Sequence, residues 1–267
     1  MEKPRRIFIT GASSGLGMAL ARAYAQTEPG VVLGLLARRS DRIETLASEL
    51  VGASCHCYTV DVLDACALKA AAEQFLRDAG GVDIVIANAG ISSGTVTGES
   101  GDSEVFARIV QTNLTAMAQT FDVFLPVMRA SGAGRLVGIA SVAGIRGLPG
   151  AGAYSASKAG AIAYLESLRV ELKGSPIKVI TIAPGYIQTP MTEHNRYPMP
   201  FLMPAQRFAE KALRAIDAGR SFVVIPWQMG WVARVLRQLP NAVFDFLFSR
   251  APRKAREPEM GPGNGAE

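Results

Sequence analysis

TGASSGLGMALARAYA, residues 10–25, follows the short apolar run 7–9 and sets three glycines among small residues just before a helical pattern begins. A strand that passes through Gly11, Gly15 and Gly17 into a helix makes a tight turn at the carboxyl edge of a sheet. Free backbone N–H groups and the helix N-terminus can face a diphosphate there, and a side chain at Gly15 or Gly17 would obstruct it. The same stretch alone also fits a flexible loop, so other residues must decide between the two.

Apolar, β-branched runs alternate with helical stretches along most of the chain. These runs cover residues 5–9, 31–36, 56–60, 82–87, 134–140, 177–183 and 221–225. Strands that are apolar on both faces are typical of a parallel sheet covered by helices on each side. The sequence therefore predicts a doubly wound α/β fold, with a mostly parallel seven-stranded Rossmann-like sheet between two helical layers.

Length and composition exclude several classes of protein. The 267 residues are 49% hydrophobic, which is enough for one substantial core. No apolar stretch reaches the roughly 18 residues of a membrane span, and the N-terminal MEKPRR lacks the apolar region of a signal peptide. The three cysteines and two histidines lack metal-ligand spacing, so we expect neither disulfides nor a metal site. We therefore expect a cytoplasmic protein.

The charge is moderately basic. There are 28 basic and 23 acidic residues, a net charge of +5, and part of the surplus lies at the two ends of the chain. Such a diffuse surplus does not indicate a nucleic-acid-binding surface, whereas it suits an anionic cofactor or a membrane surface.

Further short motifs follow the glycine-rich turn in a fixed order. They are Asp61-Val62, Asn88-Ala89-Gly90, Asn113, Ser141, Tyr154-Ser155-Ala156-Ser157-Lys158 and Pro184-Gly185. With TGxxxGxG in place of GxGxxG, the sequence resembles the short-chain dehydrogenase/reductase family over nearly the whole chain to about residue 226. It departs from the family at Ala87, where many members carry a further asparagine. That change should weaken the turn slightly and leave the chemistry intact.

Four polar residues form the predicted catalytic group. Tyr154 and Lys158 are four residues apart in a helical stretch, so they share one helical face, and the ammonium favours the tyrosinate. This lets the phenol act as a general acid or base, while Ser141, at a strand end, can hold a carbonyl oxygen. The resemblance implies that Asn113 supports a water-mediated proton relay to Lys158, and that Lys158 binds the nicotinamide ribose. Each residue alone has an ordinary structural explanation, but their joint occurrence favours an active site.

The end of the second predicted strand decides the cofactor. Residues 36–40 read LARRS, with no acid that could bind a ribose 2′-hydroxyl. Arginine suits a 2′-phosphate because its donors are planar and its charge is permanent. We therefore predict NADP(H), with Arg38 as the main anchor and Arg39 and Ser13 or Ser14 as helpers. The alternative is that both arginines are solvated loop residues.

The resemblance implies the remaining cofactor contacts. Asp61 would accept a hydrogen bond from the adenine amino group, and Ile187 and Thr189 would hold the nicotinamide carboxamide. Tyr154 and Lys158 belong to both sets. The predicted cofactor residues are Gly11, Ser13, Ser14, Gly15, Leu16, Gly17, Arg38, Arg39, Asp61, Val62, Asn88, Ala89, Gly90, Tyr154, Lys158, Pro184, Gly185, Ile187 and Thr189.

The predicted substrate region is apolar. Residues 186–204 contain three methionines, two tyrosines and a phenylalanine, and lie where the family has a mobile lid. Ile145 and Leu148 would add to an apolar wall, although all these residues could equally pack the lid onto the core. We predict an NADPH-dependent oxidoreductase for a hydrophobic ketone or secondary alcohol, with Tyr154 as general acid/base. The alternatives are a reductase for 3-oxoacyl chains, on a carrier protein or as lipids, and a non-catalytic NADP(H) sensor.

The last part of the chain extends beyond the predicted catalytic domain of residues 1–226. In residues 227–250, aromatic residues, leucines and arginines recur at helical spacing on either side of Pro240, which predicts two amphipathic helices. They could cap the pocket, pack on a second subunit or lie peripherally in a membrane interface, and packing is the simpler explanation. Residues 251–267 are rich in proline, glycine and charge and predict a disordered tail.

The resemblance also implies a homo-oligomer, either a dimer or a tetramer. The family commonly assembles through the helices that correspond to residues 113–131 and 154–173 of this chain.

Overall fold

The computed structural model of the protein describes residues 3–193, 195 and 198–256. Positions 194, 196–197 and 257–267, which belong to the predicted lid and tail, lie outside the described residues. Within the described ranges, no helix combines the length and the hydropathy that crossing a bilayer requires.

One parallel sheet organises the molecule, as predicted. Its strand order is β3-β2-β1-β4-β5-β6-β9, and every neighbouring pair is parallel. The predicted strands agree with the observed ones to within two residues at each end. The seven strands are β1 (Arg6–Thr10), β2 (Val32–Ala37), β3 (Ser54–Thr59), β4 (Ile84–Ala87), β5 (Gly134–Ile139), β6 (Ile177–Pro184) and β9 (Phe222–Ile225).

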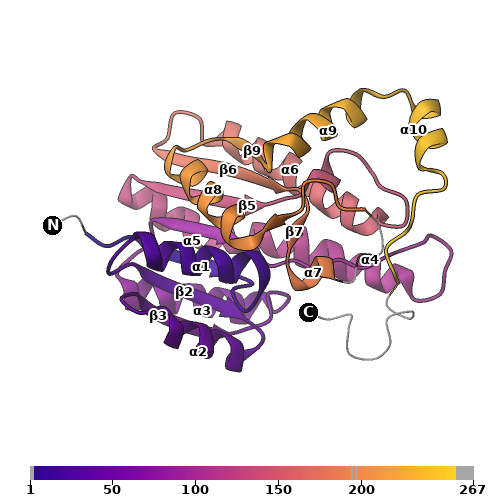
Figure 1. The fold of residues 1–267 in the computed structure, drawn as a ribbon. Helices are drawn as coiled ribbons and strands as arrows, with labels where there is room; N and C mark the ends of the chain where they lie inside the picture. Colours follow the sequence, from indigo (N-terminus) through magenta and orange to yellow (C-terminus); the bar gives the residue numbers. More distant parts are fainter. Residues whose placement is uncertain (1–2, 194, 196–197, 257–267) are drawn as a thin grey trace.

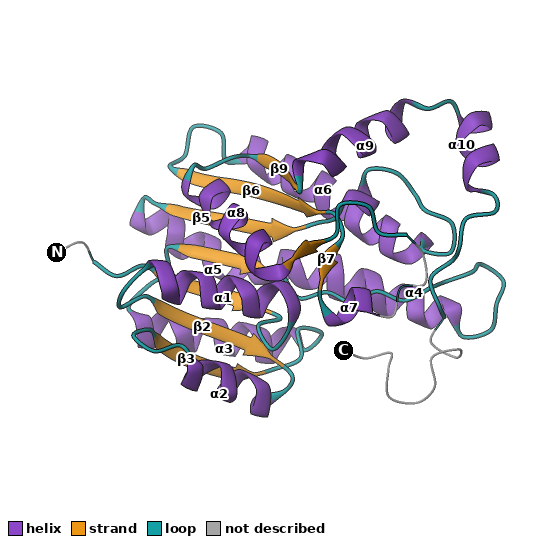
Figure 2. Cartoon of the chain, in the orientation of Figure 1, coloured by secondary structure: helices purple, strands orange, loops and turns teal. Residues whose placement is uncertain are grey.

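Helices cover both faces of this sheet (Figure 2). One face packs against α1 (Gly15–Thr27), α2 (Ser40–Glu49) and α8 (Ala205–Asp217). The other packs against α3 (Ala65–Ala79), α5 (Ala116–Ser131) and α6 (Gly152–Glu171). The described chain also contains α4 (Asp102–Val110), a π-helical turn (Gln111–Thr115), a 3-10 turn (Val142–Gly144), β7 (Ile187–Gln188), α7 (Pro190–Glu193) and β8 (Met203–Pro204).

Two hydrophobic cores lie on opposite sides of the sheet because alternate residues of a strand point to opposite faces. In β1, Ile7 and Ile9 belong to the core that contains Tyr24 of α1 and Phe208 of α8. Phe8, between them, packs in the other core, with its ring centroid 4.8 Å from that of Phe124. Both sides of β1 are fully buried, which explains why its sequence is apolar without alternation.

The sheet fixes where a ligand can bind. The chain runs outward from β1 to β2 and β3 on one side and from β4 to β9 on the other, so the strand order reverses between β1 and β4. In doubly wound sheets, ligands bind beside the carboxyl ends of the strands at such a reversal. The glycine-rich turn after β1 lies at this point.

The C-terminal extension forms two helices as predicted, α9 (Trp227–Gln238) and α10 (Asn241–Phe248). Figure 1 shows α10 at the end of the molecule opposite β3. Residues 251–256, which we call the C-terminal strap, turn back towards the body. The predicted disorder is wrong for the strap. Its backbone pairs with Gly94, and its side chains bind Ser92 and Asp102.

Candidate active site

The glycine-rich turn requires glycine at three positions. Gly11 and Gly15 have φ angles of 69° and 54°, in the left-handed region that favours glycine. At Gly17, a Cβ atom would lie 2.3 Å from the Gly11 carbonyl oxygen. The turn therefore brings the start of α1 against the end of β1, as the sequence predicts, and leaves the helix N-terminus open to an anion.

Asn88 holds this turn in place. Its side-chain Nδ2 donates to the carbonyl oxygens of Thr10, at 3.0 Å, and Gly11, at 3.1 Å. The hydroxyl of Thr10 accepts from the backbone N–H groups of Asn88 and Ala89, each at 3.1 Å. The Asn88 amide thus fixes the turn, a role that was not predicted. Thr10, the first residue of the TGxxxGxG motif, supports the turn through its hydroxyl, and this role was not predicted either.

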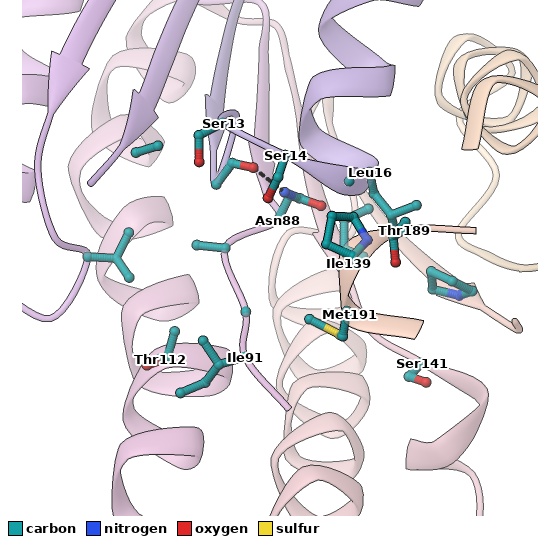
Figure 3. A pocket seen from close by; sticks show the side chains of 18 of the residues that line it. Ser13, Ser14, Leu16, Asn88, Ile91, Thr112, Ile139, Ser141, Thr189 and Met191 are labelled. Atoms are coloured by element: carbon teal, nitrogen blue, oxygen red, sulfur yellow. Dashed lines mark hydrogen bonds between the residues drawn. The ribbon is translucent and has the colours of Figure 1, made fainter. Parts of the chain in front are cut away.

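One cavity of about 540 Å³ joins the predicted cofactor and catalytic residues. Among the predicted residues, only Gly17 and Asn113 do not line it, because both are buried behind its wall. Figure 3 shows Ser13 and Ser14 beside Asn88, with Met191 and Ser141 further along the cavity. Pro190, Met191 and Thr192 also line it and belong to the predicted lid. The lining residues that were not predicted are Ala37, Val60, Leu63, Ile91, Arg108, Thr112, Ile139 and Ala140.

Two arginines stand at one end of the cavity, after β2. The Nη1 atom of Arg38 lies 3.9 Å from Oδ2 of Asp61, and Nη2 of Arg39 donates to Oγ of Ser13 at 3.3 Å. The Arg38–Asp61 pair is half-exposed and long, so water screens it strongly. Guanidinium groups, the Ser13 hydroxyl and the N-terminus of α1 therefore converge on one place suited to a phosphate.

The predicted catalytic residues converge where β5 ends and α6 begins. Ser141 follows β5, and its side chain hydrogen-bonds to Tyr154 in the first turn of α6. Lys158, one turn further along α6, has its Nζ atom 5.8 Å from the centroid of the Tyr154 ring. Lys158 donates to the carbonyl oxygen of Ile139 at 2.8 Å, so the end of β5 holds the lysine in place.

Asn113 is positioned by the π-helical turn between α4 and α5. Its Oδ1 accepts from the backbone N–H of Ile91 at 2.8 Å, and its Nδ2 donates to the Ile91 carbonyl at 3.0 Å and to Ser157 at 2.9 Å. A Cβ atom on Gly90 would lie 3.1 Å from Asn113 Oδ1 and 3.5 Å from Lys158 Nζ. Asn113 and Lys158 therefore approach each other across Gly90, with Asn113 fully buried.

Burial sets the pKa values of the two titratable catalytic groups. It raises the pKa of the Tyr154 phenol above its usual value, and the hydrogen bond with Ser141 acts in the opposite direction. Burial lowers the pKa of Lys158 to about 8. The expected lowering of the Tyr154 pKa is therefore wrong for this structure, because burial raises that pKa and the group that acts against burial is Ser141, not Lys158.

The first part of the predicted lid lines the cavity. The strands β7 and β8 pair with each other and close the loop between them, and Thr192 Oγ1 donates to the Ile187 carbonyl at 2.6 Å. Met191, from the short α7, lines the cavity and is partly exposed. Ile145 and Leu148, expected in the apolar wall, do not line this cavity.

Comparisons with known proteins agree with this geometry. A family model described as short chain dehydrogenase matches residues 5–199. An uncharacterized oxidoreductase of Myxococcus xanthus is 39% identical over 243 residues, which cover 90% of this chain and 95% of that protein. The 3-oxoacyl-(acyl-carrier-protein) reductase FabG of Thermotoga maritima is 32% identical over 214 residues, covering 79% and 82%. A solved structure of actinorhodin polyketide ketoreductase with NADPH is similar with a TM-score of 0.75 and 27% identity, covering 84% and 97%.

Proposed function

Because this chain belongs to the short-chain dehydrogenase family and is an oxidoreductase of that family, we propose that it reduces a hydrophobic ketone to a secondary alcohol with NADPH. The convergence of Ser141, Tyr154 and Lys158 on the cavity that also contains the glycine-rich turn carries this proposal. A phenol, a hydroxyl and an ammonium at one end of a dinucleotide-sized cavity suit proton transfer to a carbonyl oxygen.

The residues present fit a nicotinamide dinucleotide with a 2′-phosphate. The turn at Gly11 and Gly15 would receive the diphosphate, and Arg38 and Arg39 would bind the 2′-phosphate. Lys158 would hold the nicotinamide ribose. When bound, the reduced cofactor supplies a hydride to the carbonyl carbon of the substrate.

The protein's own residues supply the proton. Ser141 donates a hydrogen bond to the substrate carbonyl and holds it beside Tyr154. As the carbonyl carbon gains the hydride, the Tyr154 phenol gives its proton to the developing alkoxide, which leaves an alcohol and a tyrosinate. Lys158 stabilises that tyrosinate from the same helical face. With its pKa raised, the Tyr154 phenol is protonated at neutral pH, which is the form that donates the proton in a reduction.

Part of the cavity wall is apolar, which favours an apolar substrate. Ile91, Ile139 and Met191 line the cavity, and Arg108, which also lines it, adds one charged side chain. A reductase for 3-oxoacyl chains is a second candidate within the same chemistry. The name of the relative from Thermotoga maritima supports it, since that protein is named as a reductase of this kind.

A matched pair of tyrosine variants tests the proposal. NADPH oxidation is followed with a panel of hydrophobic ketones and 3-oxoacyl thioesters, and NADPH binding is measured by cofactor fluorescence. Tyr154→Phe should bind NADPH as the wild type does and lose about 10²- to 10⁴-fold in turnover, the range of general acid catalysis. Tyr164→Phe, in the same helix but packed on Phe121, should keep its turnover.

Two results would reject this function. Equal turnover in Tyr154→Phe and the wild type would remove the phenol from the chemistry. Tight NADPH binding without turnover of either substrate class would favour the non-catalytic sensor instead.

A further inference from the structure

The outer face of α9 is apolar and exposed. Trp227, Trp231 and Val235 follow one another at four-residue spacing, and their exposed fractions are 65%, 60% and 58%. Met229 and Ala233 occupy the opposite face and are buried. The helix therefore packs on the body through its smaller inward residues and turns its two indole rings outward.

The same arrangement recurs in α10. Phe246 is 82% exposed, and Val243 and Leu247 lie exposed at helical spacing beside it. Phe244 points inward, is buried, and stacks on Phe248 with ring centroids 4.4 Å apart. Single exposed apolar residues are common on proteins, but six large ones on two successive helices are unusual. We call the outward residues of α9 and α10 the apolar platform; they are Trp227, Trp231, Val235, Val243, Phe246 and Leu247.

Arg146, in the loop between the 3-10 turn and α6, holds the helices of the platform in place. Its Nη1 atom donates to the carbonyl oxygens of Leu236, at 2.6 Å, and Leu239, at 2.8 Å, where α9 ends. Its Nη2 atom donates to Asn241 Oδ1 at 3.1 Å, and its guanidinium lies 4.0 Å from the centroid of the Phe244 ring. The two helices are therefore held in a defined orientation before any partner binds.

The helices of the platform carry a net positive charge. Residues 227–250 contain three arginines, Arg234, Arg237 and Arg250, and Asp245 is their only acidic residue. All four are exposed, and the Arg234 guanidinium lies 5.4 Å from the centroid of the Trp231 ring. Tryptophan, phenylalanine and arginine together are typical of helices that lie in the headgroup region of a bilayer.

We propose that the apolar platform docks this protein on an anionic lipid surface, with α9 and α10 lying in the interface and not across it. The side chains of the platform would enter the acyl boundary, and the arginines would meet lipid phosphates. A second copy bound through the same face would bring the same arginines against one another, which like-charge repulsion opposes. An anionic surface neutralises them instead.

The fluorescence of the protein provides a direct test, because its two tryptophans are Trp227 and Trp231. The full-length protein is mixed with vesicles of phosphatidylcholine alone or of an equimolar mixture of phosphatidylcholine and phosphatidylglycerol. We expect a blue shift of the emission and quenching by brominated acyl chains with the anionic vesicles only. High salt should weaken the binding because it screens the arginines.

Two variants and a control assign the contact to the platform. Phe246→Ser should lower partitioning to anionic vesicles by about tenfold or more, since it removes a large apolar side chain from the interface. Arg234→Gln should weaken binding to the anionic vesicles and remove part of the salt effect. Val51→Ser, which replaces a valine that is 87% exposed outside the platform, should change nothing.

Three results would overturn the proposal. In the first, the wild type stays in solution when it is mixed with anionic vesicles. In the second, the Phe246→Ser variant binds the vesicles as strongly as the wild type and keeps its mass in light scattering. In the third, that variant also binds as strongly as the wild type, but light scattering shows a smaller mass. The last result would assign the platform to a second copy.

Discussion

Replacing Lys158 by methionine tests how burial sets the charge of the site. Lys158 is 4% exposed, and its pKa falls from 10.5 to about 8 because desolvation disfavours the ammonium. Below pH 8 the folded protein carries this buried charge, while in the unfolded chain the same charge is fully hydrated. Methionine has a similar length and no charge, so it should remove the penalty together with the activity.

The magnitude follows from the pKa. At 1.36 kcal/mol per pKa unit, the fall from 10.5 to about 8 corresponds to about 3 kcal/mol of destabilisation at pH 7. The variant also loses the hydrogen bond from Lys158 to Ile139, which contributes about 1 kcal/mol. Lys158→Met should therefore be more stable than the wild type by about 2 kcal/mol at pH 7.

The sign of the pH dependence is opposite to that of a lysine in an ion pair. Between pH 8 and pH 10.5 the unfolded chain binds more protons at Lys158 than the folded protein does, so this residue makes stability rise with pH. The advantage of Lys158→Met should shrink across that window and reverse near its upper end. There the burial penalty is gone and the variant lacks only the hydrogen bond, so it should be less stable by about 1 kcal/mol.

Urea unfolding at a series of pH values measures this difference directly. Lys173→Met, which replaces an exposed lysine, serves as the matched control and should show no such trend. A Lys158→Met variant that is less stable than the wild type at pH 7, or a difference that stays constant up to pH 10.5, would refute the reasoning from burial.

Three further variants probe the turn, the cofactor preference and the strap. Gly17→Ala places a Cβ atom 2.3 Å from the Gly11 carbonyl oxygen, so its free energy of unfolding, measured in urea, should fall by about 1–3 kcal/mol. The variant should also lose NADPH binding. Gly147→Ala, which places its Cβ atom in open space, should change neither the free energy of unfolding nor NADPH binding. Arg38→Gln should lower the ratio of NADPH to NADH affinity by about tenfold or more in fluorescence titrations, and an unchanged ratio would exclude Arg38 as the anchor. Asp102→Asn removes the carboxylate that Arg256 binds, so trypsin should release the C-terminus faster, as mass spectrometry can follow; an unchanged rate would mean that other contacts hold it.

The fold and the cofactor side of the site could be predicted because they depend on local patterns. Apolar runs such as 5–9 form strands buried on both faces, and the glycines of the turn are needed for close approach within a few residues. Tyr154 and Lys158 share a face because helical geometry places residues four apart together. Each of these features is encoded within one short segment.

Features that depend on distant contacts could not be predicted. Arg146 binds backbone carbonyls about ninety residues further along the chain, and no local pattern indicates that pairing. Arg108, from α4, and Thr112, next to Asn113 in the π-helical turn, reach the cavity although neither belongs to a predicted motif. The pKa of Tyr154 was predicted in the wrong direction, because spacing gives the neighbouring charge but does not give the depth of burial.

The strap has a consequence for handling the protein. Lys254 donates to Ser92 Oγ at 2.9 Å, Arg256 binds Asp102, and a Cβ atom on Gly94 would lie 2.2 Å from the Lys254 carbonyl oxygen. The strap thus holds the segment that follows Ile91 in the cavity wall. Affinity tags are better fused before β1, which Figure 1 shows on the side of the molecule away from α10. A version truncated after α10 lacks the strap, so its activity should be measured separately.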